Sequence, residues 1–160
     1  KKSIKNFFIY NKMSNIKLKD ITKIYDIVVR LNACELLSQL SDTFSDYTQH
    51  QFDTFIMYLR TTQTHKIWCV YYDDEMIGIV TTLLEPKIIH SFGYVVHVED
   101  FVIHKKWRGC GFGRKVMDKI KEYAQSAHAY KIILNCNEEN IGFYEKCGYM
   151  HKNNEMSLYL

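Results

Sequence analysis

Three glycines stand within five residues, at Gly109, Gly111 and Gly113, between a strand-like segment at 95–104 and a helix-like segment at 113–127. Glycine adopts left-handed backbone conformations without a Cβ penalty and lets the main chain approach a ligand closely. A turn that ends a strand and begins a helix also presents backbone N–H groups without a partner in the helix. Together with the positive end of the helix dipole, these groups attract phosphate. The segment therefore predicts an anion-binding turn that the rest of the chain must hold in place.

The composition is that of an ordinary globular domain: 160 residues, of which 47% are hydrophobic and 24% are charged. This length predicts one domain, which we place at residues 15–160 behind a polar N-terminal tail at 1–14. The net charge of +3 is too small for a nucleic-acid-binding surface but suits a small anionic ligand. No stretch approaches the roughly 18 apolar residues that a membrane span needs, and no secretory signal is evident.

The cysteines and histidines indicate neither a disulfide framework nor a metal centre. The five cysteines are odd in number, and none are spaced C-x-x-C. Reduced thiols in the cytoplasm are the simpler interpretation. The histidines show no H-E-x-x-H pattern and no cysteine partners, so we expect no bound metal.

Apolar periodicity predicts a short strand and two helices in the N-terminal half. The strand covers 15–19, and Asp20 is placed to cap one long helix that continues toward residue 40. Its apolar face is expected to include Ile21, Ile24, Ile27, Val28 and Leu31. A polar break at 41–46 then separates it from a second helix at 49–59.

The middle of the chain is rich in strand-forming residues. Segments 67–72 and 76–84 flank a polar turn and predict an antiparallel hairpin. Pro86 interrupts the second strand, because proline restricts a continued central strand. The extended pattern resumes at 88–90 before another turn.

The strand that precedes the glycine turn changes phase along its length. Val96 and Val98 share one parity, whereas Phe101 and Ile103 share the other. An extra residue at Glu99–Asp100 would explain this, as in a β-bulge, which leaves a backbone N–H unpaired and often lies beside an active site. A strand buried on both faces is the alternative, and periodicity alone favours neither.

An amphipathic helix after the glycine turn is predicted by apolar residues at 3-4-3 spacing: Met117, Ile120, Ala124 and Ala127. A strand at 131–135, a helix at 140–146 ended by Gly148, and a final strand at 155–160 follow. The strand–turn–helix–strand unit argues for a parallel pair joined by a crossover. We therefore expect an α/β fold in which helices flank a central, twisted, mixed sheet.

Three ligand patterns compete for the glycine turn. A Walker loop requires a Lys-Ser/Thr pair that is absent, and a dinucleotide fingerprint requires G-x-G-x-x-G near the first strand. The third pattern, R-x-x-G-x-G, is filled by Arg108, Gly111 and Gly113. A tight turn without a ligand is the ordinary alternative. The preceding strand, the following helix and an Asn-x-x-x-Tyr at Asn140–Tyr144 favour the third pattern, and with them the chain resembles the GCN5-related N-acetyltransferases (GNAT), which bind acetyl-CoA.

Further blocks narrow this resemblance to one branch of the family. Four segments are similar to successive blocks of the eukaryotic glucosamine-6-phosphate N-acetyltransferases: KIIH at 87–90, HVED at 97–100, YKIIL at 130–134 and NIGFYEKCGY at 140–149. The likeness covers residues 85–150 well and the N-terminal half loosely. It implies the GNAT fold and acetyl transfer from acetyl-CoA to glucosamine 6-phosphate, on the route to UDP-N-acetylglucosamine. It also implies a homodimer whose active site is completed across the interface.

The same resemblance, with the chemistry of amide formation, suggests roles for individual residues. Tyr144 is the candidate acid for the leaving thiolate, Glu99 and Asp100 bind the sugar hydroxyls or the ammonium group, and Asn135 occupies a further catalytic position. Cofactor contacts are expected from Phe101, Val102, Ile103, Arg108, Gly109, Cys110, Gly111, Phe112, Gly113, Arg114, Asn140 and Tyr144. Substrate contacts are expected from Ser41, Lys87, Ile88, Ile89, His90, Glu99, Asp100, Tyr130 and Lys131.

Two departures from the family pattern concern the acceptor. Asn135 stands where the family usually carries a carboxylate, and an amide cannot take a proton. The segment 157–160 contains no arginine where the family usually has a phosphate-binding one. Each candidate also has an ordinary structural role, as a packed tyrosine, a solvated strand edge or a surface lysine. We therefore keep two alternatives: acetylation of a peptide N-terminus or lysine, and a CoA-binding module without turnover.

Overall fold

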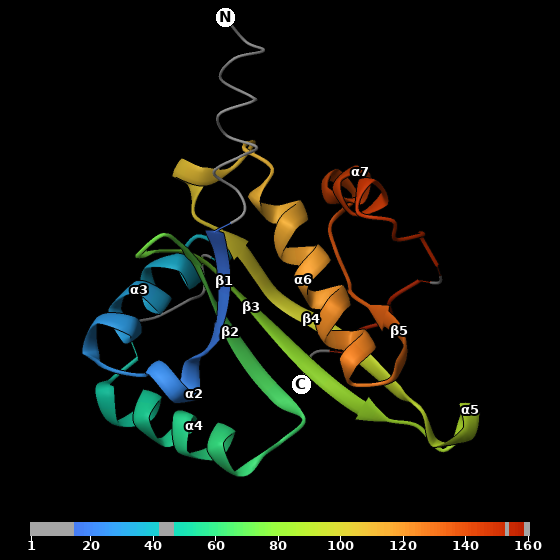
Figure 1. Cartoon of the computed structure of the whole chain (residues 1–160), viewed down its shortest axis with the longest axis horizontal. Coiled ribbons are helices and arrows are strands. Elements are labelled where there is room, and N and C mark those ends of the chain that lie inside the picture. The colour runs from blue at the N-terminus through green and yellow to red at the C-terminus, as the bar shows by residue number, and fades with distance from the viewer. Residues whose placement is uncertain (1–14, 42–46, 153, 159–160) are drawn as a thin grey trace, which may run out of the picture.

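The computed structural model describes residues 15–41, 47–152 and 154–158. Five strands form one sheet in the order β1-β2-β3-β4-β5 (Figure 1). Neighbours are antiparallel from β1 to β4, whereas β4 and β5 are parallel. The strands are β1 (Ile16–Asp20), β2 (His65–Tyr72), β3 (Glu75–Pro86), β4 (Tyr94–Ile103) and β5 (Ala129–Ile133). The mixed sheet, its hairpin and its parallel pair confirm the predicted fold class.

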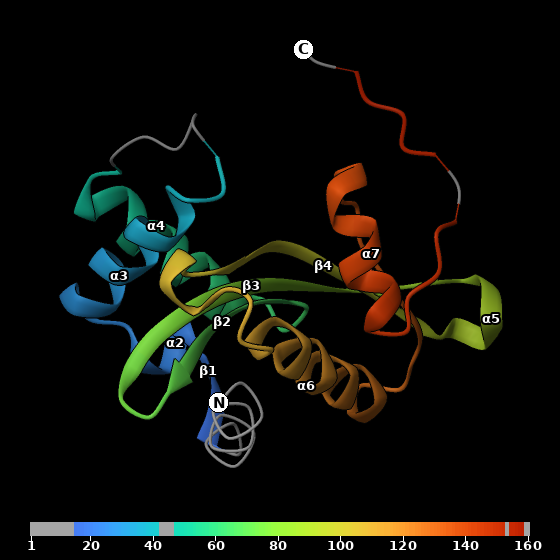
Figure 2. The same ribbon diagram turned by 90° about the horizontal axis from the view of Figure 1, so that it is seen from above.

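Helices cover both faces of this sheet (Figure 2). On one face lie α2 (Ile21–Ile24), α3 (Ile27–Leu37) and α4 (Gln49–Thr61), and on the other lies the crossover helix α6 (Phe112–Ser126). Two apolar clusters fill the layers, one beneath α6 and one beneath α3 and α4. The last helix, α7 (Glu138–Lys146), stands beside the N-terminal end of α6 (Figure 1). None of the helices in the described ranges is both long and apolar enough to cross a membrane.

The single long helix predicted after β1 is wrong, because the chain breaks at Tyr25. Asp20 caps the first helix as predicted, but Tyr25 is extended and its hydroxyl donates to Asp53 of α4 at 2.5 Å. Asp26 then caps α3 by accepting from the amide of Val29 at 2.8 Å. Because α3 begins anew after Asp26, its buried face differs from that of one continuous helix. The buried residues of α3 are Val29, Ala33 and Leu36. The predicted core residues Ile27, Val28 and Leu31 are exposed.

The second helix confirms its prediction. It begins after Thr48, whose side chain accepts from the amide of Gln51 in a reciprocal capping box. Its buried face consists of Phe52, Ile56 and Leu59.

The bulge predicted at Glu99–Asp100 is present. Ile79 of β3 pairs with Val102, whereas Thr81 pairs with Glu99, so β4 holds one residue more than β3 across this step. Asp100 has a φ of 46°, in the left-handed region. The residues whose parity differs, Val98 before the bulge and Ile103 after it, belong to the same apolar cluster beneath α6. The register thus shows the bulge, and the alternative also holds at the two ends of β4, where the adjacent residues Val95 and Val96, and Val102 and Ile103, are buried on both faces of the sheet.

Three further expectations are corrected. The segment 88–90 is not extended: α5 (Ile89–Phe92) is a tight turn in which His90 and Ser91 have left-handed backbone angles. The strand β5 begins two residues earlier than predicted, since Ala129 pairs with Tyr94. The residues 155–158 of the predicted last strand lie outside the sheet, and Met156 and Leu158 are exposed. The tail 1–14, the break at 42–46 and the final two residues lie outside the described residues.

Candidate active site

The glycine turn is built as the sequence predicts. It follows β4 and a short 3-10 turn at Lys105–Trp107, and it ends where Gly111 caps α6. Gly109 and Gly111 have φ values of 73° and 86°, so both positions require the left-handed conformation that glycine tolerates best. Glycine at these two positions therefore sets the path of the turn.

Aromatic packing anchors this turn against the sheet. The rings of Tyr72, Trp107 and Phe112 lie within 5.0–5.4 Å of one another, centroid to centroid. Glu75 accepts hydrogen bonds from Trp107 Nε1 at 3.1 Å and from Lys106 Nζ at 3.2 Å. The bond from Trp107, with that from Lys106, lowers the pKa of the Glu75 carboxyl although burial opposes the shift.

One backbone and one side-chain hydrogen bond also tie the turn to its neighbours. The amide of Lys105 donates to Gln39 Oε1, just beyond α3, at 3.0 Å. Arg108 Nε donates to the carbonyl of Ile103 at 2.8 Å, which folds the arginine back onto the end of β4. The turn is thus held from α3, from the β2–β3 hairpin and from β4.

The first turn of α6 presents its amides without acceptors. The first helical bond runs from the amide of Lys115 to the carbonyl of Gly111 at 3.3 Å, and Gly111 has no side chain that could cap the helix. Across the described ranges, no acceptor meets the amides of residues 111–114. Four N–H groups at the positive end of a 15-residue helix form a receptor for an anion.

β4 loses its parallel neighbour just before the bulge. Pairing between β4 and β5 ends at His97 and Ile133. From Phe101 to Ile103, the edge of β4 opposite β3 therefore pairs with no described strand. Phe101 packs on Phe143 of α7, with ring centroids 6.3 Å apart. A Cβ on Gly113 would lie 3.1 Å from the same ring, so glycine lets α6 approach α7 without displacing the Phe143 side chain.

Tyr144 is held on α7 by the end of that helix. Gly148 has a φ of 90°, and its amide and that of Tyr149 bond to the carbonyls of Glu145 and Tyr144 at 2.9 and 3.0 Å, in a Schellman motif. This brings the Tyr149 ring edge-on to Tyr144, with centroids 5.9 Å apart. Burial, with smaller contributions from Cys136 and Cys147, raises the pKa of Tyr144 to about 12. Its hydroxyl therefore stays protonated throughout the neutral range.

Two adjacent carboxylates mark the bulge. Glu99 and Asp100 are both exposed, and Asp100 accepts a hydrogen bond from Thr81 Oγ1 at 3.1 Å. Burial raises the pKa of Glu99, with further increases from Asp100 and from Glu155 of the C-terminal segment, while His97 lowers it. This acidic pair can attract a cation or accept hydrogen bonds from hydroxyl groups.

Lys87, predicted to bind substrate, already has a partner. Its ammonium group lies 2.5 Å from Glu85 Oε1, and His97 Nε2 lies 2.7 Å from Glu85 Oε2. Glu85 therefore links the end of β3 to β4 and offsets much of the positive charge of Lys87. Sequence reasoning did not assign site roles to Glu85, His97 or Thr81, although alternation on β4 places His97 on the same face as Glu99.

Three of the predicted substrate residues meet at the far end of the sheet. The His90 ring stacks on Tyr130 with centroids 4.3 Å apart, and Lys131 Nζ lies 5.7 Å from the Tyr130 centroid. Ile88 and Ile89 are exposed beside them. Tyr94 pairs with Ala129 at this end, and Glu99 lies five positions further along β4, which corresponds to about 17 Å. The chain therefore does not bring the His90–Tyr130 pair to the bulge.

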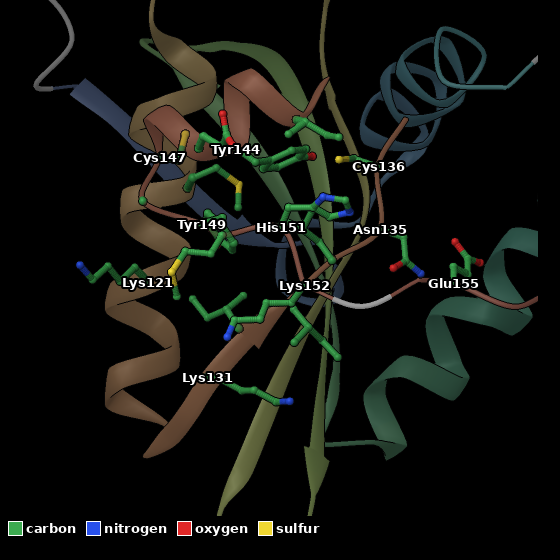
Figure 3. Close-up of a pocket in the computed structure, with 18 of the residues that line it drawn as sticks. Lys121, Lys131, Asn135, Cys136, Tyr144, Cys147, Tyr149, His151, Lys152 and Glu155 are labelled. Carbon is green, nitrogen blue, oxygen red and sulfur yellow. The ribbon is translucent and has the colours of Figure 1, made fainter. Parts of the chain in front are cut away.

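A cavity of about 1040 Å³ lies between α6, β5, α7 and the C-terminal segment (Figure 3). It is lined by Lys131, Asn135, Tyr144, Tyr149 and Glu155, among others, and it borders the candidate site from the side of β5. Asn135 follows β5 and is exposed, as is Asn140 in α7. Ser41 lies beyond α3, next to residues that are not described.

The remaining site expectations concern metal and thiols. No group of three or more His, Cys, Asp or Glu side chains is arranged to hold a metal ion in the part of the chain that the structure describes. No disulfide joins the five cysteines. Cys110 lies within the glycine turn, where its Sγ is 3.6 Å from the carbonyl of Arg108.

Comparisons with known proteins agree with this geometry. The chain matches the acetyltransferase (GNAT) family model over residues 31–149. It is 35% identical over 128 residues to the glucosamine 6-phosphate N-acetyltransferase of Arabidopsis thaliana, covering 78% of this chain and 85% of the relative. It is 33% identical over 130 residues to glucosamine 6-phosphate N-acetyltransferase 1 of Dictyostelium discoideum, covering 79% and 81%. The crystal structure of the Arabidopsis thaliana enzyme aligns with a TM-score of 0.79 and 30% identity over 90% of this chain and 97% of that one. The chain therefore belongs to the GNAT family of acetyltransferases.

Proposed function

We propose that residues 15–160 form a cytoplasmic acetyltransferase that moves the acetyl group of acetyl-CoA to the amine of D-glucosamine 6-phosphate. The products are N-acetylglucosamine 6-phosphate and CoA. Similarity to glucosamine 6-phosphate N-acetyltransferases over most of the chain supports this substrate pair. The observation that carries the proposal is the set of unpaired amides at residues 111–114 beside the open edge of β4.

The amides and the open strand account for binding of acetyl-CoA. The diphosphate accepts hydrogen bonds from the first turn of α6, where the helix dipole favours negative charge. The pantetheine arm then extends along the backbone of Phe101–Ile103, whose edge has no strand partner among the described residues. Asn140 orients this arm from α7. A bound thioester is thereby directed toward the bulge at Glu99–Asp100.

The chemical step is a direct attack of the amine on the thioester carbonyl. A C–N bond forms, the C–S bond breaks, and the amine loses one proton while the thiolate gains one. Holding both reactants in one site converts this into an effectively unimolecular step. The amine of an amino sugar is less basic than that of lysine, so the demand for a strong base is small. Glu99 and Asp100 attract the ammonium form and hold the sugar hydroxyls. The ammonium group loses a proton to solvent before the neutral amine attacks, and a backbone N–H of the bulge stabilises the developing oxyanion.

Tyr144 serves the leaving group. Because its pKa is raised to about 12, its hydroxyl remains a hydrogen-bond donor at every physiological pH. It stabilises the thiolate as the C–S bond breaks. No acyl-enzyme is required, and Cys110 lies in the turn that binds the diphosphate rather than beside Tyr144.

The acceptor site also requires a second copy of the chain. His90 and Tyr130 lie at the opposite end of β4 from the bulge, too far to share one hexosamine phosphate with Glu99, and Lys131 beside them also lines the cavity next to Tyr144. We propose a homodimer in which this group supplies the phosphate contacts of the partner's site. Ile88 is 84% exposed, Met156 92% and Leu158 85%, so apolar surface is available for an interface.

Thiol release from acetyl-CoA tests the proposed reaction. We expect rapid release with glucosamine 6-phosphate and much slower release with glucosamine, because the phosphate supplies binding energy. Release with peptide amines but not with glucosamine 6-phosphate would show that the acceptor is a peptide or protein and not an amino sugar. Binding of CoA without release with any amine would reduce the chain to a binding module.

The dimer is tested by light scattering during size-exclusion chromatography. The wild-type chain should have the mass of two copies, and the double variant Met156→Asp, Leu158→Asp should have the mass of one. The variant should also lose turnover while still binding acetyl-CoA, since the loop lies within one chain. A wild-type monomer with full activity would refute the shared site.

A further inference from the structure

We propose that Thr81 is a positioning residue for the acetyl-transfer reaction, because its hydroxyl fixes the orientation of the Asp100 carboxylate. The inference rests on the proposed function, in which Asp100 contacts the amino sugar. Thr81 lies on β3, a strand that otherwise supplies no group to the reaction. It would act through Asp100 and not by touching the substrate.

The contact itself is well defined. Thr81 Oγ1 donates to Asp100 Oδ2 at 3.1 Å, from a side chain that is only 5% exposed. Asp100 is exposed, so its carboxylate is at the surface while the hydroxyl that holds it is inside the sheet. A buried threonine has few rotamers, because its β-branch restricts χ1. The donor is therefore fixed, and the carboxylate takes its orientation from the donor.

The bulge explains why Asp100 needs such a donor. Its φ of 46° is uncommon for a residue other than glycine, and the bulge removes it from the regular ladder. Thr81 pairs with Glu99, so its hydroxyl lies directly across from the two adjacent carboxylates. Glu99 carries like charge beside Asp100, and its pKa is raised mainly by burial and further by Asp100. A hydrogen bond to a charged acceptor opposes the repulsion between the two carboxylates.

The neighbouring threonine provides a matched control. Thr82 is fully buried, but its side chain points to the α6 face, where its Oγ1 accepts from Trp68 Nε1 at 2.9 Å. The two threonines thus have the same size, the same strand and similar burial, yet only Thr81 reaches a carboxylate of the site.

The test compares three variants: Thr81→Val, Thr81→Ser and Thr82→Val. Thr81→Val keeps the shape of the side chain and removes the donor. It should lower kcat/KM for glucosamine 6-phosphate about tenfold, since a hydrogen bond to a charged group is lost, while the Kd for acetyl-CoA stays within about twofold. Thr81→Ser restores the donor and should return kcat/KM to within about threefold of wild type. Thr82→Val should lower Tm, because it leaves the Trp68 N–H without its partner, but should leave kcat/KM unchanged.

A crystal structure of Thr81→Val gives a readout that does not depend on the substrate. The Asp100 carboxylate should leave its wild-type position while the backbone of the bulge is retained. An unmoved Asp100, or a folded Thr81→Val enzyme with wild-type kcat/KM, would overturn the proposal. Equal losses of activity in Thr81→Val and Thr82→Val would also overturn it, in favour of a general packing effect. If the wild-type chain itself fails to turn over glucosamine 6-phosphate, the proposed function fails, and the position of Asp100 still decides the role of Thr81.

Discussion

At the residue scale, the proposed chemistry depends on how burial changes a phenol. Tyr144 and Tyr149 lie edge-on at the end of α7, and burial raises the pKa of both hydroxyls. The two differ in their surroundings. Tyr149 Oη is buried and has no partner among the described residues, whereas Tyr144 projects toward Cys136, which also lines the cavity (Figure 3). A protonated donor near a leaving thiolate is useful only at the second of these positions.

This difference predicts opposite outcomes for the same substitution. Tyr144→Phe should lower kcat about 100-fold, within the range for loss of a general acid, with little change in acetyl-CoA binding. Tyr149→Phe should leave kcat within about twofold of wild type and should not lower the stability, because it removes a buried hydroxyl that has no partner. Stopped-flow measurement of CoA release, with isothermal titration for binding, distinguishes them. Equal loss of turnover in both variants would mean that the ring packing matters and the Tyr144 hydroxyl does not.

Residue by residue, the sequence allows chemical roles to be proposed but does not give the contacts of the side chains. Glu99, Asp100 and Tyr144 could be named because their residue types and spacing carry the resemblance. Thr81 and Glu85 could not, because each acts through a partner on β4 that only the register of the sheet brings opposite. Lys87 illustrates the same limit: its charge is visible in the sequence, but its pairing with Glu85 is a tertiary contact.

At the scale of elements, the glycine turn and α6 form the best-specified unit of the chain. Periodicity, the glycines and the bulge all lie within residues 95–127, and each was confirmed. Elsewhere the local sequence pattern led to two wrong predictions, one continuous helix after β1 and an extended segment at 88–90. The cap at Asp26 divides α3 from α2, and the left-handed angles at His90 and Ser91 turn an apparently extended segment back toward Gly93. Both features depend on contacts with distant elements, Asp53 in the first case and Tyr130 in the second.

The turn should be intolerant of a side chain at Gly111. Its φ of 86° is strained for any other residue, and most strained for a β-branched one. We expect Gly111→Val to abolish acetyl-CoA binding and Gly111→Ala to weaken it at least tenfold, because the amides of the first turn move away from the diphosphate. Titration with CoA, followed by calorimetry or intrinsic fluorescence, measures both.

The matched control is Gly142→Ala on α7. A Cβ there would meet nothing within 4 Å, and alanine is the better helix former, so this variant should bind normally and be slightly more stable. Thermal unfolding of all three variants separates loss of binding from loss of folding. Intact affinity in a folded Gly111→Val chain would refute the account of the loop.

At the scale of the whole molecule, one sheet separates two apolar layers with different tasks. The layer beneath α6 fixes the turn and, through Phe143 and Tyr144, joins α7 to the sheet. The layer beneath α3 and α4 is structural and holds Cys69, which is completely buried on β2. Ionisable side chains, such as Tyr144 in one layer and Cys69 in the other, are therefore packed on both sides of the sheet. The stability of the fold should depend on whether these side chains stay neutral.

This arrangement predicts loss of stability in alkali. Burial raises the pKa of Cys69 from 9.0 to about 12, and those of Tyr25 and Tyr144 from 10.0 to about 12. Between its unfolded pKa and its folded pKa, each group has lost its proton in the unfolded chain but keeps it in the folded chain. The free energy of unfolding therefore falls as pH rises. Cys69 alone contributes a slope of about 1.4 kcal/mol per pH unit above pH 9, and the tyrosines steepen it above pH 10.

Urea unfolding at pH 8, 9.5 and 11 in reducing buffer measures this dependence of stability on pH. Cys69→Ala should be less stable at pH 8 because of the small cavity but should lose much of the slope between pH 9 and 10, the remainder coming from Cys147, whose pKa burial also raises. Cys136→Ala, at an exposed site, should follow the wild type. A Cys69→Ala chain with the wild-type slope would show that the buried thiol ionises no differently in the folded and unfolded states.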